Sequence, residues 1–279
     1  MIRPIYTLKE WVDIKYLNWN YLSRNPNAID LLMNNQDKIN WDMLCFNTNP
    51  CIIDLLKTNM DKIDWTYLSS NPCAIELLEN NLDLVNWYEL CKNPNGLRLL
   101  MAYPERVDWN CLCRNANPQV IKILEANKSK INWSILSGNP NAMKLLYENI
   151  DKIDWHILSS NPNAMPLIKT RLEDINLFYL QLNPNCMEII KDNSQLINWR
   201  ELSQFPNLIG FLEVNQDKIH WTTLSSNPAI FDITYDYNGI EKNFQQLRDE
   251  IIEYALHPRR MLKLMQEYGE DEIYDIYFD

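Results

Sequence analysis

Residues 151–165, DKIDWHILSSNPNAM, gather side chains that carry out catalysis in many proteins. A histidine, His156, stands close to the hydroxyl pair Ser159 and Ser160, which is the kind of set used for general-base and nucleophilic chemistry. Such chemistry needs partners held at a fixed geometry. Whether this segment is a site therefore depends on the elements that position it and on what surrounds it.

The segment is one copy of a motif that recurs along the chain. Residues 61–75 read DKIDWTYLSSNPCAI, and residues 217–231 read DKIHWTTLSSNPAIF. Prolines follow one another at a spacing of 22 residues, or 24 where Pro50 and Pro118 are reached. Tryptophans keep the same period, with Leu177 in the one vacant position. The tryptophans are Trp19, Trp41, Trp65, Trp87, Trp109, Trp133, Trp155, Trp199 and Trp221.

Each repeat has the signals of two short helices. Asn precedes Pro in nine of ten repeats, Phe205 being the exception, and predicts an N-cap followed by proline at the first helical position. A second asparagine column, which begins with Asn35, predicts a helix stop through the left-handed conformation that Asn tolerates. Asp or Asn before each tryptophan predicts another N-cap, and Trp41 and Leu44 share one face of the helix that follows.

Helices this short are marginal alone, but stacked copies bury a continuous core. We therefore predict an all-α fold, a right-handed α-solenoid of about ten two-helix 22-residue repeats with a helical C-terminal cap. The predicted boundaries are an N-terminal cap at 1–16, the solenoid at 17–228, the helical cap at 229–268 and an acidic tail at 269–279. A leucine-rich repeat has a similar period, but the adjacent leucines of this motif favour a helix face over a strand.

The motif DKIDWxxLSxNPNAIxLL, with the leading LKEWVDIKYLNW and the closing EYALHPRRMLKLMQEYG, resembles the tandem-repeat proteins of giant DNA viruses of amoebae, the mimivirus-like group. The resemblance covers nearly the whole chain. It implies an interaction module that acts in infected cells or in virions, and thus a location in the host-cell cytoplasm or the virion. It supplies no catalytic residues.

The residues of catalytic type fall in phase with the repeat. Equivalents of His156 in other repeats supply no consistent partner, so we expect a solvent-facing variable position there. Cys45, Cys91 and Cys113 take a slot that serine holds elsewhere, which indicates a small, semi-buried side chain. Cys111 and Cys113 lack a second pair at zinc spacing. We predict no enzyme, no cofactor and no metal site.

The two positions after each tryptophan vary while the framework stays constant. A solenoid recognises its partners through such positions, and aromatic side chains are favoured anchors. The alternative is that some of these aromatics only fill the groove between helices. The predicted partner-binding residues are Tyr21, Tyr67, Tyr88, His156, Phe178, Tyr179 and Arg200.

Two irregularities are also informative. Each of the loops that end at Pro50 and Pro118 contains two additional residues. Either a binding rim or neutral drift explains these insertions. The repeat from Pro162 to Leu182 carries Pro166 within its first predicted helix and Leu177 for Trp. An interior proline costs about 3 kcal/mol, which predicts a bend or a soft joint there.

The composition and net charge limit the kinds of partner that we expect for this chain. The net charge is −11, and the last thirteen residues hold six acidic groups and no basic ones, so we expect no nucleic acid partner. The sequence lacks a continuous apolar run long enough for a membrane helix. We predict a monomer that binds a protein partner of unknown identity. The alternative is a virion or assembly component that self-associates through the solenoid ends.

Overall fold

The computed structural model describes residues 4–190, 197–235 and 237–268 and consists mainly of short helices. The chain divides into two compact bodies: Leu8–Asp232, called here the repeat body, and Met1–Thr7 together with Ile233–Asp279. The predicted acidic tail, 269–279, and Asn193 of the second asparagine column lie outside the described residues.

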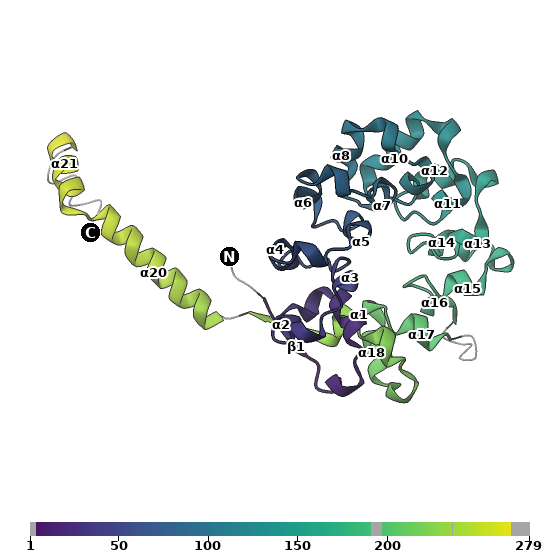
Figure 1. Ribbon diagram of the computed structural model, residues 1–279, viewed down its shortest axis with the longest axis horizontal. Coiled ribbons are helices and arrows are strands. Elements are labelled where there is room, and N and C mark those ends of the chain that lie inside the picture. The colour runs from purple at the N-terminus through teal and green to yellow at the C-terminus, as the bar shows by residue number, and fades with distance from the viewer. Residues whose placement is uncertain (1–3, 191–196, 236, 269–279) are drawn as a thin grey trace. The chain divides into compact units, whose positions relative to one another are not determined.

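The all-α solenoid of two-helix repeats is confirmed (Figure 1). Each repeat begins with a helix at the tryptophan position, called here a Trp helix. Repeats are numbered 1–10 by these helices: α1 (Trp19–Arg24), α3 (Trp41–Leu44), α5 (Trp65–Ser69), α7 (Trp87–Lys92), α9 (Trp109–Leu112), α11 (Trp133–Ser137), α13 (Trp155–Leu158), α15 (Leu177–Leu180), α17 (Trp199–Leu202) and α19 (Trp221–Leu224).

A second helix follows in repeats 1–9, and the repeats are linked by 3-10 turns such as Gln36–Lys38 and Ile150–Lys152. The second helices are α2 (Ile29–Met33), α4 (Ile52–Lys57), α6 (Ile75–Glu79), α8 (Leu97–Ala102), α10 (Pro118–Ala126), α12 (Met143–Tyr147), α14 (Met165–Ile168), α16 (Met187–Ile190) and α18 (Ile209–Glu213).

The predicted N-caps of the Trp helices are confirmed. Asn40 Oδ1 accepts the backbone N–H of Met43 at 2.9 Å, and Asp64 Oδ1 accepts that of Tyr67 at 3.0 Å. Each cap satisfies a donor that the first helical turn leaves unpaired. A four-residue helix persists in this fold because its first turn is capped and its neighbours bury one face.

The helix stop at the second asparagine column is also confirmed, but its predicted mechanism is wrong. Asn35 has φ −140°, which is not left-handed. Its carboxamide Nδ2 instead donates to the carbonyl oxygen of Leu31 at 2.9 Å, and Asn59 does the same to Leu55. A side-chain donor thus satisfies a carbonyl that the helix end leaves open.

Proline has a milder role than the sequence indicated. Pro26 opens a 3-10 turn, Pro26–Ala28, and α2 begins only at Ile29. Pro166 does not interrupt a helix, because it lies in the first turn of α14, where a missing N–H costs little. The bend predicted from an interior proline therefore loses its physical basis.

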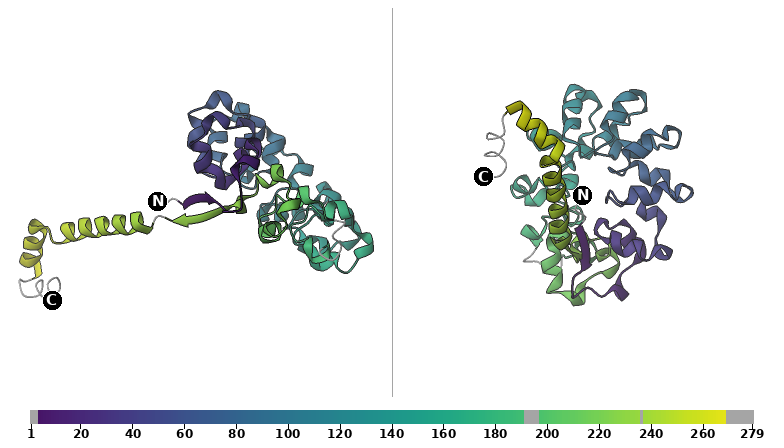
Figure 2. Two further views of the ribbon diagram at one scale, coloured as in Figure 1. Left: turned by 90° about the horizontal axis from the view of Figure 1, so that it is seen from below. Right: turned by 90° about the vertical axis from the view of Figure 1, so that its left-hand side faces the viewer.

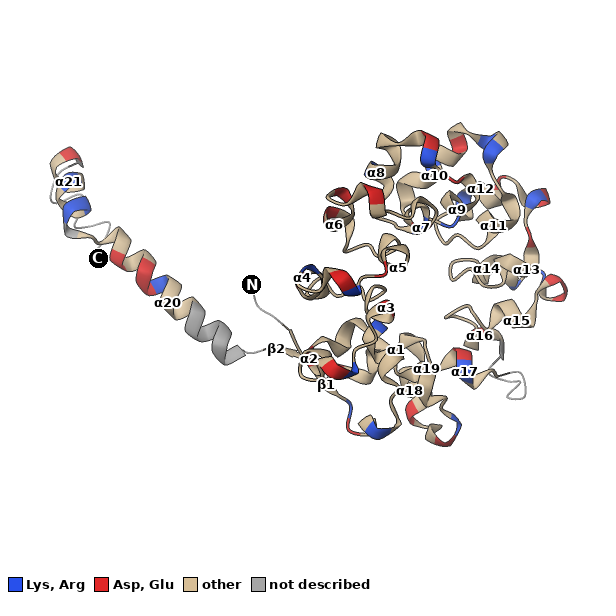
Figure 3. Cartoon of the chain, in the orientation of Figure 1, with Lys and Arg blue, Asp and Glu red and all other residues tan. Residues whose placement is uncertain are grey.

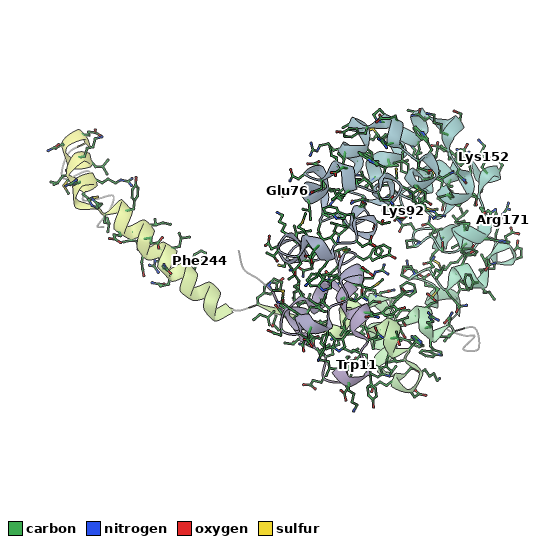
Figure 4. All side chains as sticks on the ribbon, viewed as in Figure 1. Trp11, Glu76, Lys92, Lys152, Arg171 and Phe244 are labelled. Carbon is green, nitrogen blue, oxygen red and sulfur yellow. The ribbon has the colours of Figure 1, made fainter. Side chains whose placement is uncertain are left out.

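The tryptophans of the repeats are half-buried and do not form the core. Leucines such as Leu44 and Leu158 are fully buried instead. A cation from the turn that leads into the next repeat covers the exposed face of most tryptophans: Lys62 Nζ lies 4.3 Å from the ring centroid of Trp41. Figure 4 places Lys152 and Arg171, which cover Trp133 and Trp155, at the outer edge of the repeat body.

A buried asparagine joins each pair of consecutive repeats. Asn47 Nδ2 donates to the carbonyl oxygens of Ser23 and Asn25 in the preceding repeat, both at 2.9 Å. Its Oδ1 accepts the backbone N–H of Asn49. We call these residues the ladder asparagines; they are Asn25, Asn47, Asn71, Asn93, Asn115, Asn139, Asn161, Asn183 and Asn227.

The ladder fixes the place of the two insertions. Every ladder position lies six residues after its tryptophan position, so Asn47 and not Asn49 belongs to the ladder in repeat 2. Asn49 occupies an outer row, where its Nδ2 donates to Pro26 O at 2.7 Å. The two added residues therefore follow the ladder asparagine and precede the second helix, which starts at Ile52.

The ladder closes on itself, which the sequence did not indicate. Asn25 of repeat 1 donates to Ser225 O at 3.0 Å and to Asn227 O at 2.9 Å, both in repeat 10. In the same way Asn18 N–H donates to Ser225 Oγ at 2.8 Å. In Figure 1 the first helices of the repeat body accordingly lie beside its last ones. The end repeats cover each other's edges.

The residues before repeat 1 strengthen this closure. The Tyr16 ring lies 5.1 Å from that of Trp221, where other repeats place a lysine. Lys9 N–H donates to Ile230 O at 2.9 Å, and Lys9 Nζ pairs with Asp232 at 2.6 Å. The start and the end of the repeat body adjoin in both views of Figure 2.

Two strands, β1 (Pro4–Leu8) and β2 (Phe231–Tyr235), pair in a two-stranded sheet that the sequence analysis missed. The second body also holds two helices within the predicted cap range of 229–268, α20 (Tyr237–Ala255) and α21 (Pro258–Tyr268). Phe244 of α20, labelled in Figure 4, is 73% exposed, and Leu247 and Ile251 are exposed as well. Their predicted role as a cap stays a prediction.

We call the contact between two neighbouring repeats a joint and label it by their numbers. The closure predicts that joint 10/1 is as stable as a joint between two consecutive repeats. Asn25→Ala removes two buried hydrogen bonds and should lower the free energy of unfolding by about 2–3 kcal/mol, as much as Asn93→Ala in repeat 4. Asn95→Ala, which removes one exposed bond to Pro72 O, serves as the control and should cost under about 1 kcal/mol. Urea unfolding measures all three. An Asn25→Ala cost no larger than that of Asn95→Ala would contradict closure.

The lysines and arginines that cover the tryptophans form a row, called here the cation row. This row predicts a stabilising substitution. Leu84 is exposed at the position that holds lysine in other repeats, and no described cation covers Trp65. Leu84→Lys should therefore add about 0.5–1 kcal/mol of stability through a cation–π contact with Trp65. Leu84→Gln has a similar size without the charge and should add none. Equal stability of the two variants in urea unfolding would argue against this role of the row.

Candidate interaction surface

The position after each tryptophan forms a row on the Trp helices, called here the variable row. Its residues are exposed in repeats 1–9 and half-buried in repeat 10. The row contains Asn20, Asp42, Thr66, Tyr88, Asn110, Ser134, His156, Phe178, Arg200 and Thr222. Its side chains contact the next repeat: Asn40 Nδ2 donates to Asn20 Oδ1 at 3.3 Å, and Ser134 Oγ donates to Asp154 Oδ2 at 2.5 Å.

The structure separates the seven predicted binding residues into two groups. Four of them are exposed members of the variable row, namely Tyr88, His156, Phe178 and Arg200. The other three stand one position further on and are half-buried, namely Tyr21, Tyr67 and Tyr179. The seven do not form one patch, because they belong to repeats 1, 3, 4, 7, 8 and 9.

Tyr67 fits the alternative of filling the groove between helices. Its ring lies 4.7 Å from that of Phe46 in the preceding repeat. The guanidinium of Arg24 lies 5.4 Å from the Phe46 ring, so three repeats are joined by one stack. A half-buried ring engaged in such a stack contributes mainly to the joint between repeats.

Tyr88 has a different environment. Its ring is 49% exposed, and Lys92 Nζ lies 4.5 Å from the ring centroid while pairing with Glu89 at 2.6 Å. A side-chain hydrogen bond with Cys111 raises the pKa of the Tyr88 phenol. Figure 4 shows Lys92 toward the interior of the repeat body. Tyr88 therefore presents an oriented aromatic surface on this inner side.

Phe178 is the most exposed large aromatic of the repeat body, at 67%. Its ring meets that of Tyr179 edge-on, with centroids 5.7 Å apart. The backbone that carries both rings is fixed, because Asn176 Oδ1 accepts the N–H groups of Phe178 and Tyr179. An exposed phenylalanine on a capped helix suits a contact surface.

The histidines show no catalytic arrangement among the described residues. His156 is exposed and makes no hydrogen bond or ion pair with another described residue that would support base catalysis. His220 caps α19, since its Nδ1 accepts the N–H of Thr223 at 3.3 Å. His257 Nδ1 accepts the N–H of Arg259 and so caps the start of α21.

The cysteines in the serine column are structural. Burial raises the pKa of Cys45 and Cys91 to about 11, and burial also raises that of Cys113. Such thiols stay protonated near neutral pH and are poor nucleophiles. Cys91 Sγ accepts the N–H of Asp108 at 3.4 Å, as serine does in other joints. Within the described ranges, no three His, Cys, Asp or Glu side chains converge as a metal site.

Charges of both signs are interspersed over the repeat body rather than gathered in one region (Figure 3). Ion pairs link neighbouring second helices, as Lys57 with Glu76 and Lys169 with Glu188. A surface of this kind lacks the continuous basic strip that phosphate backbones require. In the part of the chain that the structure describes, none of the helices has the length and apolar character needed to cross a bilayer.

Comparisons with protein-family models, with curated proteins and with solved structures found no match to this chain. Sequence reasoning found the variable row but missed the neighbours that set its character, Phe46 and Lys92. Both lie five residues after a tryptophan, a position whose variation along the repeats was the signal that could have identified it.

Thiol accessibility gives a test of the buried serine column. Near pH 8 in Ellman's assay, exposed Cys51 should react first and half-buried Cys73 more slowly. The five buried thiols should react only after denaturant is added, to give seven in total. Cys51→Ser should remove the fast phase. Rapid reaction of more than two thiols in the native protein would contradict the described packing.

Proposed function

We propose that this chain is a non-enzymatic repeat scaffold that binds a protein partner through the variable row. The observation that carries the proposal is the contrast between a constant framework and an exposed row that changes in every repeat. The caps, the ladder and the cation row account for the recurring residues. They do not account for Tyr88 and Phe178, which expose large aromatic surfaces.

The partner chemistry follows from the row. Neutral polar residues separate two aromatic anchors, so the row suits a protein surface with apolar residues at intervals and hydrogen-bonding groups between them. Tyr21, Tyr67 and Tyr179 are half-buried and would contribute support rather than contact area. His156 and Arg200 are exposed and would contribute polar contacts.

The setting is proposed from the resemblance alone: a giant virus of amoebae, with the protein in the host-cell cytoplasm or the virion. Self-association through solenoid ends is the weaker alternative. The groups that would join copies end to end, Asn25 of repeat 1 and the carbonyl oxygens of repeat 10, already bind each other. We accordingly propose a monomer.

Anchor substitutions test the proposal. Binders selected from displayed protein fragments of an amoebal host should lose affinity roughly tenfold or more for Tyr88→Ala or Phe178→Ala, as expected for buried aromatic anchors. Surface plasmon resonance on the full chain measures the change. Unfolding free energy should stay within about 0.5 kcal/mol, since both side chains are exposed.

Tyr147 gives a matched control. It is 51% exposed, close to Tyr88, but it ends α12, a second helix outside the variable row. Tyr147→Ala should leave the affinity unchanged. Binders that depend on Tyr147, or on none of the three aromatics, would overturn the proposal. Growth of the particle mass with concentration in light scattering would favour the self-association alternative.

A further inference from the structure

The closed ladder has one interrupted joint, between repeats 8 and 9. Phe205 occupies the ladder position of repeat 9, and its side chain has no hydrogen-bond donor. The carbonyl oxygens of Gln181 and Asn183, which a ladder asparagine would bind, receive no hydrogen bond from a described residue of repeat 9. The backbone of Phe205 remains in register, because its own carbonyl oxygen accepts from Asn227 Nδ2.

A second contact is lost at the same joint. In joint 3/4, Ser69 Oγ accepts the backbone N–H of Asn86 at 2.9 Å, and equivalent bonds recur in other joints. Gln181 stands in the place of that serine. Its Nε2 turns back to Leu177 O at 3.1 Å, and its Oε1 is buried without a partner among the described residues. An unpaired buried oxygen destabilises the closed arrangement.

Among the described residues, few other contacts link repeats 8 and 9. Asn207 Nδ2 donates to Pro184 O at 2.8 Å, which is the outer-row bond. Leu177 replaces tryptophan and is 41% exposed, so this position offers no ring for a cation–π contact. Joint 10/1, by contrast, has both ladder bonds of Asn25, the bond of Asn18 to Ser225 Oγ and the outer-row bond of Asn27 to Pro228 O.

From this contrast we infer that the closed repeat body opens at joint 8/9, where the chain is continuous, and stays shut at joint 10/1, where its two ends meet. Among the described residues, opening at 8/9 breaks one carboxamide bond between repeats, that of Asn207 to Pro184 O, and lets water reach Gln181 Oε1. Opening at 10/1 breaks these four bonds, the bond of Lys9 N–H to Ile230 O and the ion pair of Lys9 with Asp232. The joint with the fewest bonds opens first.

The opening changes the variable row. Phe178 and Tyr179 belong to repeat 8 and Arg200 to repeat 9, so the joint sets the spacing between an aromatic and a basic group of the row. This consequence rests on the proposed function, whereas the hinge itself does not. A scaffold with one adjustable joint adapts one part of its row to a partner and keeps the rest fixed.

Two label pairs test the hinge in the free protein. Spin labels introduced as non-canonical amino acids at Phe178 and Arg200 span joint 8/9, and labels at Asn20 and Thr222 span joint 10/1. All four positions belong to the variable row, so the pairs are geometrically matched. We expect the distance distribution of the first pair to be at least about twofold broader than that of the second. A first pair as narrow as the second, or a broader second pair, overturns the inference.

A second experiment tests the hinge by restoring the missing contacts at joint 8/9. Gln181→Ser with Phe205→Asn supplies both absent groups and should narrow the first distribution to the width of the second. If the double variant folds and the width of the first distance distribution is unchanged, the inference is overturned. If the variant does not fold, the comparison of the two label pairs in the protein without these substitutions decides. No partner is present in either arm, so failure of the hinge is distinguishable from failure of the proposed binding function.

Discussion

The structure depends on one interaction, a buried side-chain amide that donates to two backbone carbonyl oxygens of the preceding repeat. Asn47 makes both bonds at 2.9 Å while its Oδ1 accepts an N–H of its own repeat. At that place aspartate would lack the donors, serine would lack the reach and the second donor, and the extra methylene of glutamine would displace the carboxamide. Because these groups are buried, leaving either hydrogen bond unmade would cost free energy. The spacing between repeats is therefore set by polar geometry, and the leucines fill the space that this geometry leaves.

This constraint explains which residues are free to vary. Within a joint the ladder asparagine, the serine or cysteine column and the caps each have a partner, so their types recur. The position after each tryptophan bonds to the next repeat only in some repeats, as at Asn20 and Ser134, and elsewhere carries Tyr88, His156 or Arg200. Where the ladder residue itself is lost, at Phe205, the neighbouring serine is also replaced by Gln181. The two losses coincide at one joint instead of being spread over the body.

The sequence predicted most features of the structure that arise within a single repeat. Caps, helix order, the repeat period and the exposed row follow from residue types at fixed spacing. The ladder was seen only as a column of caps, because the partners of Asn47 lie 22 and 24 residues away and spacing alone does not reveal them. Closure was missed for a related reason: it depends on a small rotation between repeats, summed over ten of them, that no single repeat encodes. The strand pair was missed because β1 is short and its partner lies at the far end of the chain.

The central claim is that repeat 10 binds repeat 1 as any repeat binds the next. Nuclear Overhauser effects from asparagine carboxamide protons, in protein labelled selectively at asparagine, test it most directly. Closure predicts cross-peaks from the Asn25 carboxamide to the backbone protons of Ser225 and Asn227, as strong as those from Asn47 to Ser23 and Asn25. Cross-peaks present for Asn47 and absent for Asn25 would contradict closure and leave an open solenoid.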